Sequence, residues 1–591
     1  MNMIWKWINN PEVHIPCEIS NVNDYLKVLW KTLNDISTES KITYEQIKEN
    51  PFLLKDMDRL VERMIIAFQK QEKVIVFWDY DVDGVSWTAV MYKWLKYLWF
   101  KNLDWIAPTR DTWYSIKSEY IEDYISVNWN SKYPDLIITV DCWIKSNHEI
   151  DKISKEMMID IIVTDHHLPW ESLSKYWIAH VDPHRKDSQY PFKPMSWSFV
   201  ALKVIEALNM KLPFVSWPEW KPNLAKNELQ ELAVLWIVAD MMPIVWENKV
   251  LVKECIPRYI FSKNKWIQTF TKMLVNQNMN NPTDVKDLWP DLIWWQIWPR
   301  INAAKRMWDS TIPLDMLLSD DQEQINYWFK ELDNINAERK DLVDWEKNIA
   351  FNQVNEIVNS WEHAICYISP ETNDWIIWLI AWKLKEYYWL PTIVIWWYKN
   401  WILKWSCRSV EWVHILNILD KLSHYLLGYW WHAMAAWFSI KEENLEKFVN
   451  DFYNFCKINV KKEDIIRKKY TYWYIRSYWI IQQPFLNVIK LSAPYWMWNP
   501  EPEFVILWKV KYVNFMWKNE QHLKITITDS QNEIVTWICF NYERIFFELK
   551  DTLKNWFIWQ NIWLVWTLWL NEYNGIVNKQ VSFNDIIILN S

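Results

Sequence analysis

Acidic residues follow a short apolar run early in this chain. Asp79, Asp81 and Asp83 stand at alternate positions directly after Val74–Phe77, and Gly84 comes next. Carboxylates at this spacing offer oxygen ligands for a hard divalent cation, and the glycine permits a sharp turn behind them. A calcium-binding loop is the other interpretation. It requires a helix before the loop, and here the preceding run is typical of a buried strand.

Three later segments repeat the pattern. Asp141 follows one apolar run, Asp165-His166-His167 follow a second, and Asp240 ends a third. Because the carboxyl ends of parallel strands meet at one edge of a sheet, these groups could form a two-metal site. The mixed oxygen and nitrogen donors suit Mn²⁺, with Mg²⁺ as the competitor. A lone histidine pair is more often structural, but a pair beside acidic strand ends favours metal binding.

The elements that must position these residues alternate between strand and helix. Residues 74–240 predict a doubly wound α/β domain, with strands at Val74–Phe77, Leu136–Val140 and Ile161–Thr164 and helices near 88–100 and 197–208. Residues 311–356 are highly charged with helical spacing, which predicts a long connecting helix, or a coiled-coil partner segment as the alternative. Residues 360–455 predict a second α/β domain. Residues 470–591 predict an all-β domain, with a small barrel favoured over a sandwich.

Composition excludes several classes of protein. Seven scattered cysteines without a CxxC pair argue against a disulfide framework or a zinc ribbon and suit a cytoplasmic protein. We expect no signal peptide and no membrane span, because no uninterrupted apolar segment is long enough. The net charge of −8 gives no global case for nucleic-acid binding, although a local basic groove would suffice.

Tryptophan and glycine occur in an unusual ratio. The chain has 51 Trp and 3 Gly among 591 residues, whereas folded chains contain about 7% glycine. Many of the tryptophans lie beside Pro, Asn, Asp or Ser at expected turns, where a backbone without Cβ is favoured. We hypothesise that most of them are glycine in the natural protein, because its gene comes from a lineage that reads UGA as glycine. A genuinely tryptophan-rich chain is the alternative.

Several segments carry a family resemblance, the last three of them when their tryptophans are replaced by glycine. In chain order they are Asp79–Gly84, Asp165–His167, Ala239–Pro243, Trp298–Ala304, Trp430–Phe438 and Trp496–Pro502. They resemble the DHH phosphoesterase superfamily, and specifically the RecJ family of single-strand-specific DNA exonucleases. The resemblance implies metal-dependent hydrolysis of single-stranded DNA in the 5′→3′ direction to mononucleotides, in DNA repair and recombination.

The resemblance also implies individual site residues. Those that hold two Mn²⁺ or Mg²⁺ ions would be Asp79, Asp81, Asp83, Asp141, His166, His167 and Asp240. Asp165 would orient the histidines instead of binding metal. Those that contact the phosphates of DNA, including its 5′-phosphate end, would be Arg110, Arg300, Asn302, Ser406, Arg408 and His432.

The implied architecture is a multidomain α/β chain. We expect an N-terminal helical segment over residues 1–70 and a DHH domain with a parallel sheet over 71–260. A helical part with the long connecting helix would follow over 261–356. A DHH-associated α/β domain is expected over 357–456, and a linker with an OB-fold over 457–591. A monomer is expected, with a helicase and a single-strand-binding protein as partners. Two alternative functions remain: a small-substrate DHH phosphodiesterase acting on short oligonucleotides or a nucleotide bisphosphate, and a non-catalytic DNA-binding replication scaffold.

Overall fold

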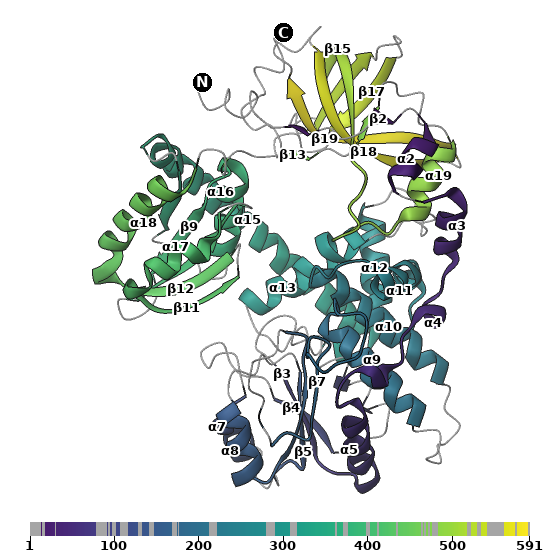
Figure 1. The fold of residues 1–591 in the computed structure, drawn as a ribbon, viewed down its shortest axis with the longest axis vertical. Coiled ribbons are helices and arrows are strands. Elements are labelled where there is room, and N and C mark those ends of the chain that lie inside the picture. Colours follow the sequence, from purple (N-terminus) through teal and green to yellow (C-terminus); the bar gives the residue numbers. More distant parts are fainter. Residues whose placement is uncertain are drawn as a thin grey trace. The chain divides into compact units, whose positions relative to one another are not determined.

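A computed structural model of the chain forms two compact units (Figure 1). One unit comprises residues 30–336 and 486–501, and the other comprises 1–29, 337–485 and 502–591. The structure describes residues 13–14, 18–19, 21–29, 31–78, 91–92, 95–96, 102–106, 116–127, 133–140, 147–167, 174, 176–211, 222–278, 290–307, 316–360, 363–369, 376–397, 402–410, 413–432, 435–461, 465, 469–470, 473–475, 483–516, 522–528, 534–539, 561–573 and 576–588.

The first unit is built on a five-stranded parallel sheet. Its spatial order is β4-β3-β5-β6-β7, with bounds β3 Val74–Trp78, β4 Leu103–Ile106, β5 Leu136–Val140, β6 Asp160–Thr164 and β7 Ala179–Val181. The predicted doubly wound sheet is therefore confirmed. The chain leaves β3 for one edge and then returns to β5 on its other side, so the strand order reverses between β3 and β5. Ligands of such sheets bind at the carboxyl ends of the strands beside this reversal.

Helices cover both faces of this sheet because its strands are apolar on both sides. Val74 and Val76 pack with α5 and α9, whereas Ile75 and Phe77 pack with α7 and α8. Figure 1 shows the two helix pairs on opposite sides of the strands. The bounds are α5 Met57–Lys70, α7 Ser118–Val127, α8 Asn147–Glu156 and α9 Trp197–Lys211. The alternation follows from the period of two along a strand.

A helical layer extends the core of the same unit. It comprises α10 Pro222–Ala239, α11 Trp246–Cys255, η3 Ile256–Phe261, α12 Lys265–Asn278, η5 Leu292–Ile297 and α13 Trp298–Met307. The predicted connecting helix is α15, Gln322–Ser360, which is 39 residues long. No helix in the described ranges is both long and apolar enough to cross a membrane.

The N-terminal region differs from the predicted helical segment. It contains helices, namely α2 Val22–Val28, α3 Leu33–Lys41, α4 Tyr44–Ile47 and the short η1 Pro51–Leu53. However, β1 (Val13–His14) and β2 (Glu18–Ile19) are strands that pair in parallel with β13 (Lys469–Tyr470) and β14 (Trp473–Ile475). Two-residue strands are held by distant partners and leave no periodic pattern in the sequence.

The second unit contains a mixed α/β sheet of order β11-β12-β10-β9-β8. Only β8 and β9 pair in parallel within it. The helices α17 and α18 pack on one face, and α15 and α16 on the other. The bounds are β8 Ile365–Ser369, α16 Ile377–Tyr388, β9 Thr392–Trp397, β10 Ile402–Arg408, α17 Ile415–Lys421, η6 Ser423–Tyr425, β11 Leu426–His432, β12 Ala435–Lys441, η7 Glu442–Asn444 and α18 Leu445–Asn459.

The C-terminal strands close into a five-stranded barrel. The strand β15 pairs with both β16 and β18, and β17 pairs in parallel with β19, so the order β15-β16-β17-β19-β18 returns to β15. The bounds are α19 Gln483–Ser492, β15 Phe504–Met516, β16 His522–Thr528, β17 Ile534–Cys539, β18 Asn561–Tyr573 and β19 Ile576–Ile588. Closure into five strands is the OB architecture that the sequence predicts.

Residues 486–501, which precede this barrel, belong to the first unit. The backbone N–H of Ile244 donates to the carbonyl of Met497 at 2.8 Å. The rings of Trp294 and Trp496 lie 5.6 Å apart between centroids. The chain therefore contacts the helical layer of the first unit directly before it enters the barrel.

Candidate active site

Four parallel strands of the first unit end in a single row. Backbone pairing places Trp78, Val140, Thr164 and Val181 side by side across β3, β5, β6 and β7. In the sequence an aspartate follows each of them, as Asp79, Asp141, Asp165 and Asp182. The predicted ligands Asp79, Asp81, Asp83 and Asp141 lie outside the described residues, so the structure gives the edge that carries them but not their side chains.

His167 is held by its neighbour Asp165 at this edge. Nδ1 of His167 lies 2.8 Å from Oδ1 of Asp165, which also accepts from the backbone N–H groups of His166 and His167. Burial alone would raise the pKa of Asp165, but the bonds from His167 and the charges of both histidines outweigh burial and lower it to about 2. The carboxylate is therefore ionised at neutral pH. It favours the tautomer of His167 that leaves the lone pair on Nε2.

His166 is oriented by a backbone carbonyl. Its Nδ1 lies 3.1 Å from the oxygen of Met195, in the loop before α9. A proton on Nδ1 satisfies this contact and again leaves the lone pair on Nε2. The two imidazole rings lie 4.7 Å apart between centroids. In both histidines Nδ1 therefore contacts a protein acceptor, as is usual for metal-binding histidines.

Asp240 lies in the turn that ends α10. Its backbone N–H donates to Trp236, and Met241 then adopts a left-handed conformation with φ 53°. The N–H of Met242 reaches back to the carbonyl of Ile237 at 3.0 Å, which closes the helix end. Asp240 is thus presented at a helix terminus of the same unit, after an apolar helix that packs on α9.

The described part of the chain holds only some members of the predicted metal set. Within it, no three His, Cys, Asp or Glu side chains form a group that could bind a metal ion. The histidines nevertheless fit a divalent cation, because both Nδ1 atoms are engaged and the carboxylate beside them is ionised. Of the remaining predicted ligands, Asp79 and Asp141 directly follow neighbouring strands in the sequence, whereas Asp240 directly follows α10.

Comparison with known proteins agrees with this geometry. The family model described as "DHH family, N-terminal domain" matches residues 73–234, and the model described as "RecJ OB domain" matches 480–585. The expected resemblance to the RecJ group of the DHH family is therefore confirmed in both of these domains.

Individual relatives extend this similarity over most of the chain. The single-stranded-DNA-specific exonuclease RecJ of Bacillus subtilis is 26% identical over 91% of this chain, which spans 64% of that protein. The Haemophilus influenzae RecJ is 25% identical over 96% of this chain and 97% of that protein. The crystal structure of Thermus thermophilus RecJ in complex with Mn²⁺ has a TM-score of 0.72 at 22% identity, covering 91% of this chain and 72% of that chain.

The predicted phosphate-binding residues of the chain fall in two places. Ser406 and Arg408 lie on β10 in the second unit, and Nη1 of Arg408 donates to the carbonyl of Cys407 at 2.7 Å and contacts Oγ of Ser406 at 3.4 Å. Burial lowers the pKa of the Arg408 guanidinium to about 10, and no carboxylate among the described residues contributes to that shift. A half-buried cation with no carboxylate partner among the described residues is suited to an anionic ligand.

Backbone pairing also brings His432 close to Arg408. Both residues are paired with Ala435, so the three lie in one row across β11, β12 and β10. The predicted grouping of Arg408 and His432 is therefore present in the backbone register. Arg110, the remaining predicted arginine of the first α/β domain, lies outside the described residues.

Arg300 and Asn302 lie elsewhere, on α13. The guanidinium of Arg300 is buried and donates to Asp333 through Nε at 2.9 Å and Nη2 at 2.6 Å, and through Nη1 to the carbonyl of Gln296 at 2.8 Å. These contacts tie α13 to α15 and leave little of the guanidinium for a phosphate. The buried Oδ1 of Asn302 accepts no hydrogen bond from any described residue.

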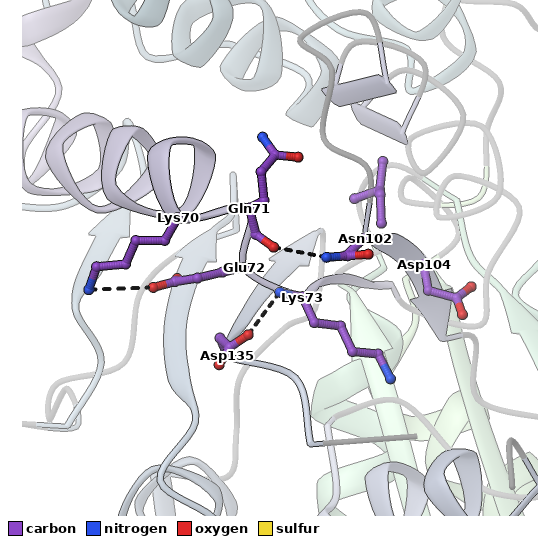
Figure 2. A pocket seen from close by; sticks show the side chains of 8 residues that line it. Lys70, Gln71, Glu72, Lys73, Asn102, Asp104 and Asp135 are labelled. Carbon is purple, nitrogen blue, oxygen red and sulfur yellow. Dashed lines mark hydrogen bonds and ion pairs between the residues drawn. The ribbon is translucent and has the colours of Figure 1, made fainter. Parts of the chain in front are cut away.

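A pocket of about 640 Å³ lies at the opposite edge of the DHH sheet (Figure 2). Its polar groups are paired with one another: the N–H of Lys73 donates to Asp135 at 2.8 Å, and Asn102 donates to the carbonyl of Gln71 at 2.9 Å. Ligands of doubly wound sheets bind at the carboxyl edge, whereas this pocket surrounds the first residues of β3, β4 and β5. We assign it a structural role.

Sequence reasoning missed Asp182 among the strand-end aspartates. This residue is 1% exposed and accepts the backbone N–H of His184 at 2.7 Å. Burial, with a further contribution from the charge of Asp165, raises its pKa to about 7. The preceding strand β7 has only three residues, too few for a periodic pattern, so the one available signal was a short apolar run before an aspartate.

Proposed function

We propose that this chain is a divalent-metal-dependent exonuclease that hydrolyses single-stranded DNA from its 5′ end to mononucleotides, in DNA repair and recombination. The observation that carries the proposal is the strand-end row, where two histidines with engaged Nδ1 atoms stand between aspartate-bearing strands. The relatives named as single-stranded-DNA-specific exonucleases support it, and so do the solved RecJ structures in complex with Mn²⁺ or Mg²⁺.

The chain's own residues would divide the work as follows. Asp79, Asp81, Asp83, Asp141, His166, His167 and Asp240 would hold two ions, Mn²⁺ or Mg²⁺, at the carboxyl edge of the sheet. When bound, such ions activate water and neutralise charge on the scissile phosphate. Asp165 and the carbonyl of Met195 orient the two imidazoles. Asp165 stays ionised while it does so, because its pKa is about 2.

Substrate contacts are proposed for a second group of residues. Arg408, Ser406, His432 and Arg110 would bind phosphates of the strand, with Arg110 at the 5′-phosphate. A planar guanidinium binds a phosphate through two parallel hydrogen bonds. The five-stranded barrel would hold the strand further along, because OB-folds combine basic grooves with stacking surfaces.

The proposed domains are those expected from the sequence. The two family matches fall inside 71–260 and 457–591. Residues 1–70, 261–356 and 357–456 would complete the chain. We further propose that the protein acts as a monomer in the cytoplasm, alongside a helicase and a single-strand-binding protein that supply and compete for its substrate.

One assay tests this function. The full chain is incubated with Mn²⁺ and a 5′-phosphorylated single-stranded oligonucleotide labelled at its 3′ end, and the products are followed over time. We expect stepwise shortening from the 5′ end, no cleavage of a blunt duplex, and loss of activity with a chelator or in Asp141→Ala. Cleavage of only the shortest oligonucleotides would indicate a small-substrate phosphodiesterase. Binding without cleavage would indicate a scaffold.

A further inference from the structure

Asn248 connects the two loops that lead to the metal-binding edge. This residue lies in α11 and is 0% exposed. Its Nδ2 donates to the carbonyl of Pro194 at 2.8 Å and to the carbonyl of Pro243 at 3.0 Å. One side-chain amide therefore fixes the distance between two loops that lie far apart in the sequence.

Each of these loops leads to a predicted metal ligand. Pro194 directly precedes Met195, whose carbonyl contacts Nδ1 of His166 at 3.1 Å. Pro243 follows Asp240 by three residues, across the closed helix end formed by Met241 and Met242. A continuous path of short contacts thus runs from His166 through Asn248 to the turn that carries Asp240.

The base of this path is rigid. Glu247, the residue before Asn248, is 0% exposed and accepts hydrogen bonds from both Tyr190, at 2.8 Å, and Lys203, at 3.0 Å. It also accepts the backbone N–H of Glu49 at 3.0 Å. Buried networks of this kind restrain the elements that they join, so the start of α11 cannot move independently of α9.

The other polar atom of the Asn248 side chain, Oδ1, argues against a purely structural role. The buried Oδ1 of Asn248 accepts no hydrogen bond from any described residue. An unsatisfied buried acceptor lowers stability, and an apolar residue of similar size would avoid it. The two donated bonds are therefore the contribution that distinguishes asparagine at this position.

We propose that Asn248 is a positioning residue that sets the separation of His166 and Asp240 for metal binding. The inference rests on the proposed function, because it takes both residues as ligands. Residues around a metal centre that hold its ligands in place typically change metal affinity by about 10- to 100-fold when they are lost. We expect Asn248→Ala to weaken Mn²⁺ binding within that range.

The test measures Mn²⁺ binding directly. The full chain and its variants are titrated with Mn²⁺, and the free ion is followed by its electron paramagnetic resonance signal. Asn248→Ala is compared with Asn336→Ala, which removes another buried asparagine, on α15. We expect weaker binding only in Asn248→Ala. Wild-type affinity in a folded Asn248→Ala protein would overturn the inference, whereas no Mn²⁺ binding by the wild type would overturn the proposed function and this inference with it.

A measurement on the wild type covers the case in which the variant does not fold. Hydrogen–deuterium exchange with and without Mn²⁺ should show protection of residues 193–199 and 241–248 together, because one amide holds both loops. Protection of one loop without the other would also overturn the inference.

A different observation supports a second inference, about the tryptophans. Trp246, Trp389 and Trp498 have φ of 48°, 53° and 61°, and they are three of the seven residues other than glycine with positive φ in the described part of the chain. The left-handed region is unfavourable for a bulky residue and normal for glycine.

Two of these positions are ones where glycine has a defined structural use. Trp389 directly follows α16, and its N–H donates to the carbonyl of Lys385 at 2.8 Å, as in a glycine helix end. Trp498 is the third residue of a turn in which Trp496 and Asn499 exchange backbone hydrogen bonds at 2.8 and 2.9 Å. A positive φ at this turn position selects glycine or asparagine.

Buried indoles add to this observation. Trp266 and Trp405 are both 0% exposed, and neither indole N–H has a hydrogen-bond partner among the described residues. A buried tryptophan N–H usually finds an acceptor. We infer that residues 246, 389 and 498 are glycine in the natural protein, together with 266 and 405.

Peptide mass spectrometry of the protein from its source organism tests this inference. We expect glycine masses at these five positions, and tryptophan masses at 246, 389 and 498 would overturn it. In the full chain that carries these tryptophans, Trp389→Gly and Trp498→Gly should raise the melting temperature. Trp345→Gly, in the middle of α15, should lower it because glycine weakens a helix interior. A fall in all three variants would contradict the inference.

Discussion

Nδ1 of His167 lies 2.8 Å from Oδ1 of Asp165, a residue that is itself 5% exposed. The contact joins a buried anion to an imidazole at the end of β6. The carboxylate of Asp165 therefore contacts the ring of His167, and it also accepts a hydrogen bond from the backbone N–H of His166 at 2.7 Å.

This relationship predicts a specific loss when Asp165 is removed. Asp165→Ala should weaken Mn²⁺ binding by about 10- to 100-fold, because His167 loses the acceptor that fixes its ring and tautomer. Calorimetric titration with Mn²⁺ measures the change. Asp187→Ala is the control, since Asp187 pairs with Arg185 in the same domain. Equal affinities in the two variants would contradict the assigned role.

Arg408 should act on substrate binding. Arg408→Gln is expected to raise the KM for a 5′-phosphorylated single strand by about 10- to 100-fold, because a charged hydrogen bond to phosphate is lost. Steady-state kinetics with varied oligonucleotide concentration measures it. Lys441→Gln removes a more exposed charge of the same sheet and should leave KM unchanged. An unchanged KM in Arg408→Gln would show that this arginine contacts no substrate.

Arg300 should act on stability. Its pair with Asp333 is buried on the arginine side and 37% exposed on the aspartate side, so Arg300→Ala should lower the unfolding free energy by about 2 kcal/mol, less than for a fully buried pair. Asp333→Ala should have a similar effect, and the double variant should fall short of their sum. Chemical denaturation measures all three. A raised KM in Arg300→Ala but not in Asp333→Ala would instead support the predicted contact with DNA.

Glu231 should make stability depend on pH. Burial raises its pKa from 4.5 to about 7, so the folded state holds a proton that the unfolded state has already lost between these values. The contribution of Glu231 is therefore fully present below about pH 4.5 and is lost as pH rises through 7. Between pH 5 and 8 the loss amounts to about 2 kcal/mol.

Replacing Glu231 tests that dependence. Urea unfolding at pH 5 and pH 8 should show a smaller difference in Glu231→Gln than in the wild type. Glu338→Gln, on the exposed side of α15, should keep the wild-type difference. If Glu231→Gln retained it as well, the titrating group would have to lie elsewhere.

Much of the fold was predictable because its central strands are short apolar runs bounded by turns. The prediction of Leu136–Val140 agrees with β5 to the residue, and α15 lies where the charged helical segment was expected. The strands β1, β2 and β7 were not predicted. Each has two or three residues, and pairing with distant strands, not local preference, holds them in place.

The residues of the site could be predicted from the sequence only where the type of side chain indicates its role. The histidine pair and its strand are where the sequence placed them, and Asp165 contacts His167 as expected. Asn248 and the carbonyl of Met195 could not be anticipated, because contacts to backbone carbonyls leave no pattern in side-chain identity. Arg300 looked like a phosphate ligand by its motif, yet its donors are directed to Asp333 and Gln296.

The chain passes between the two units four times, and the short segment at residues 486–501 limits how the protein can be divided. The match to the RecJ OB domain begins at residue 480. A truncation there would remove Met497 and Trp496, which contact Ile244 and Trp294 of the first unit. A barrel deletion or exchange should therefore retain residues up to 501 and start at 502. Cut in that way, the remaining part keeps the segment that closes its own core. However, β14 loses its parallel partner β15, so an exchanged barrel has to supply an edge strand for β14.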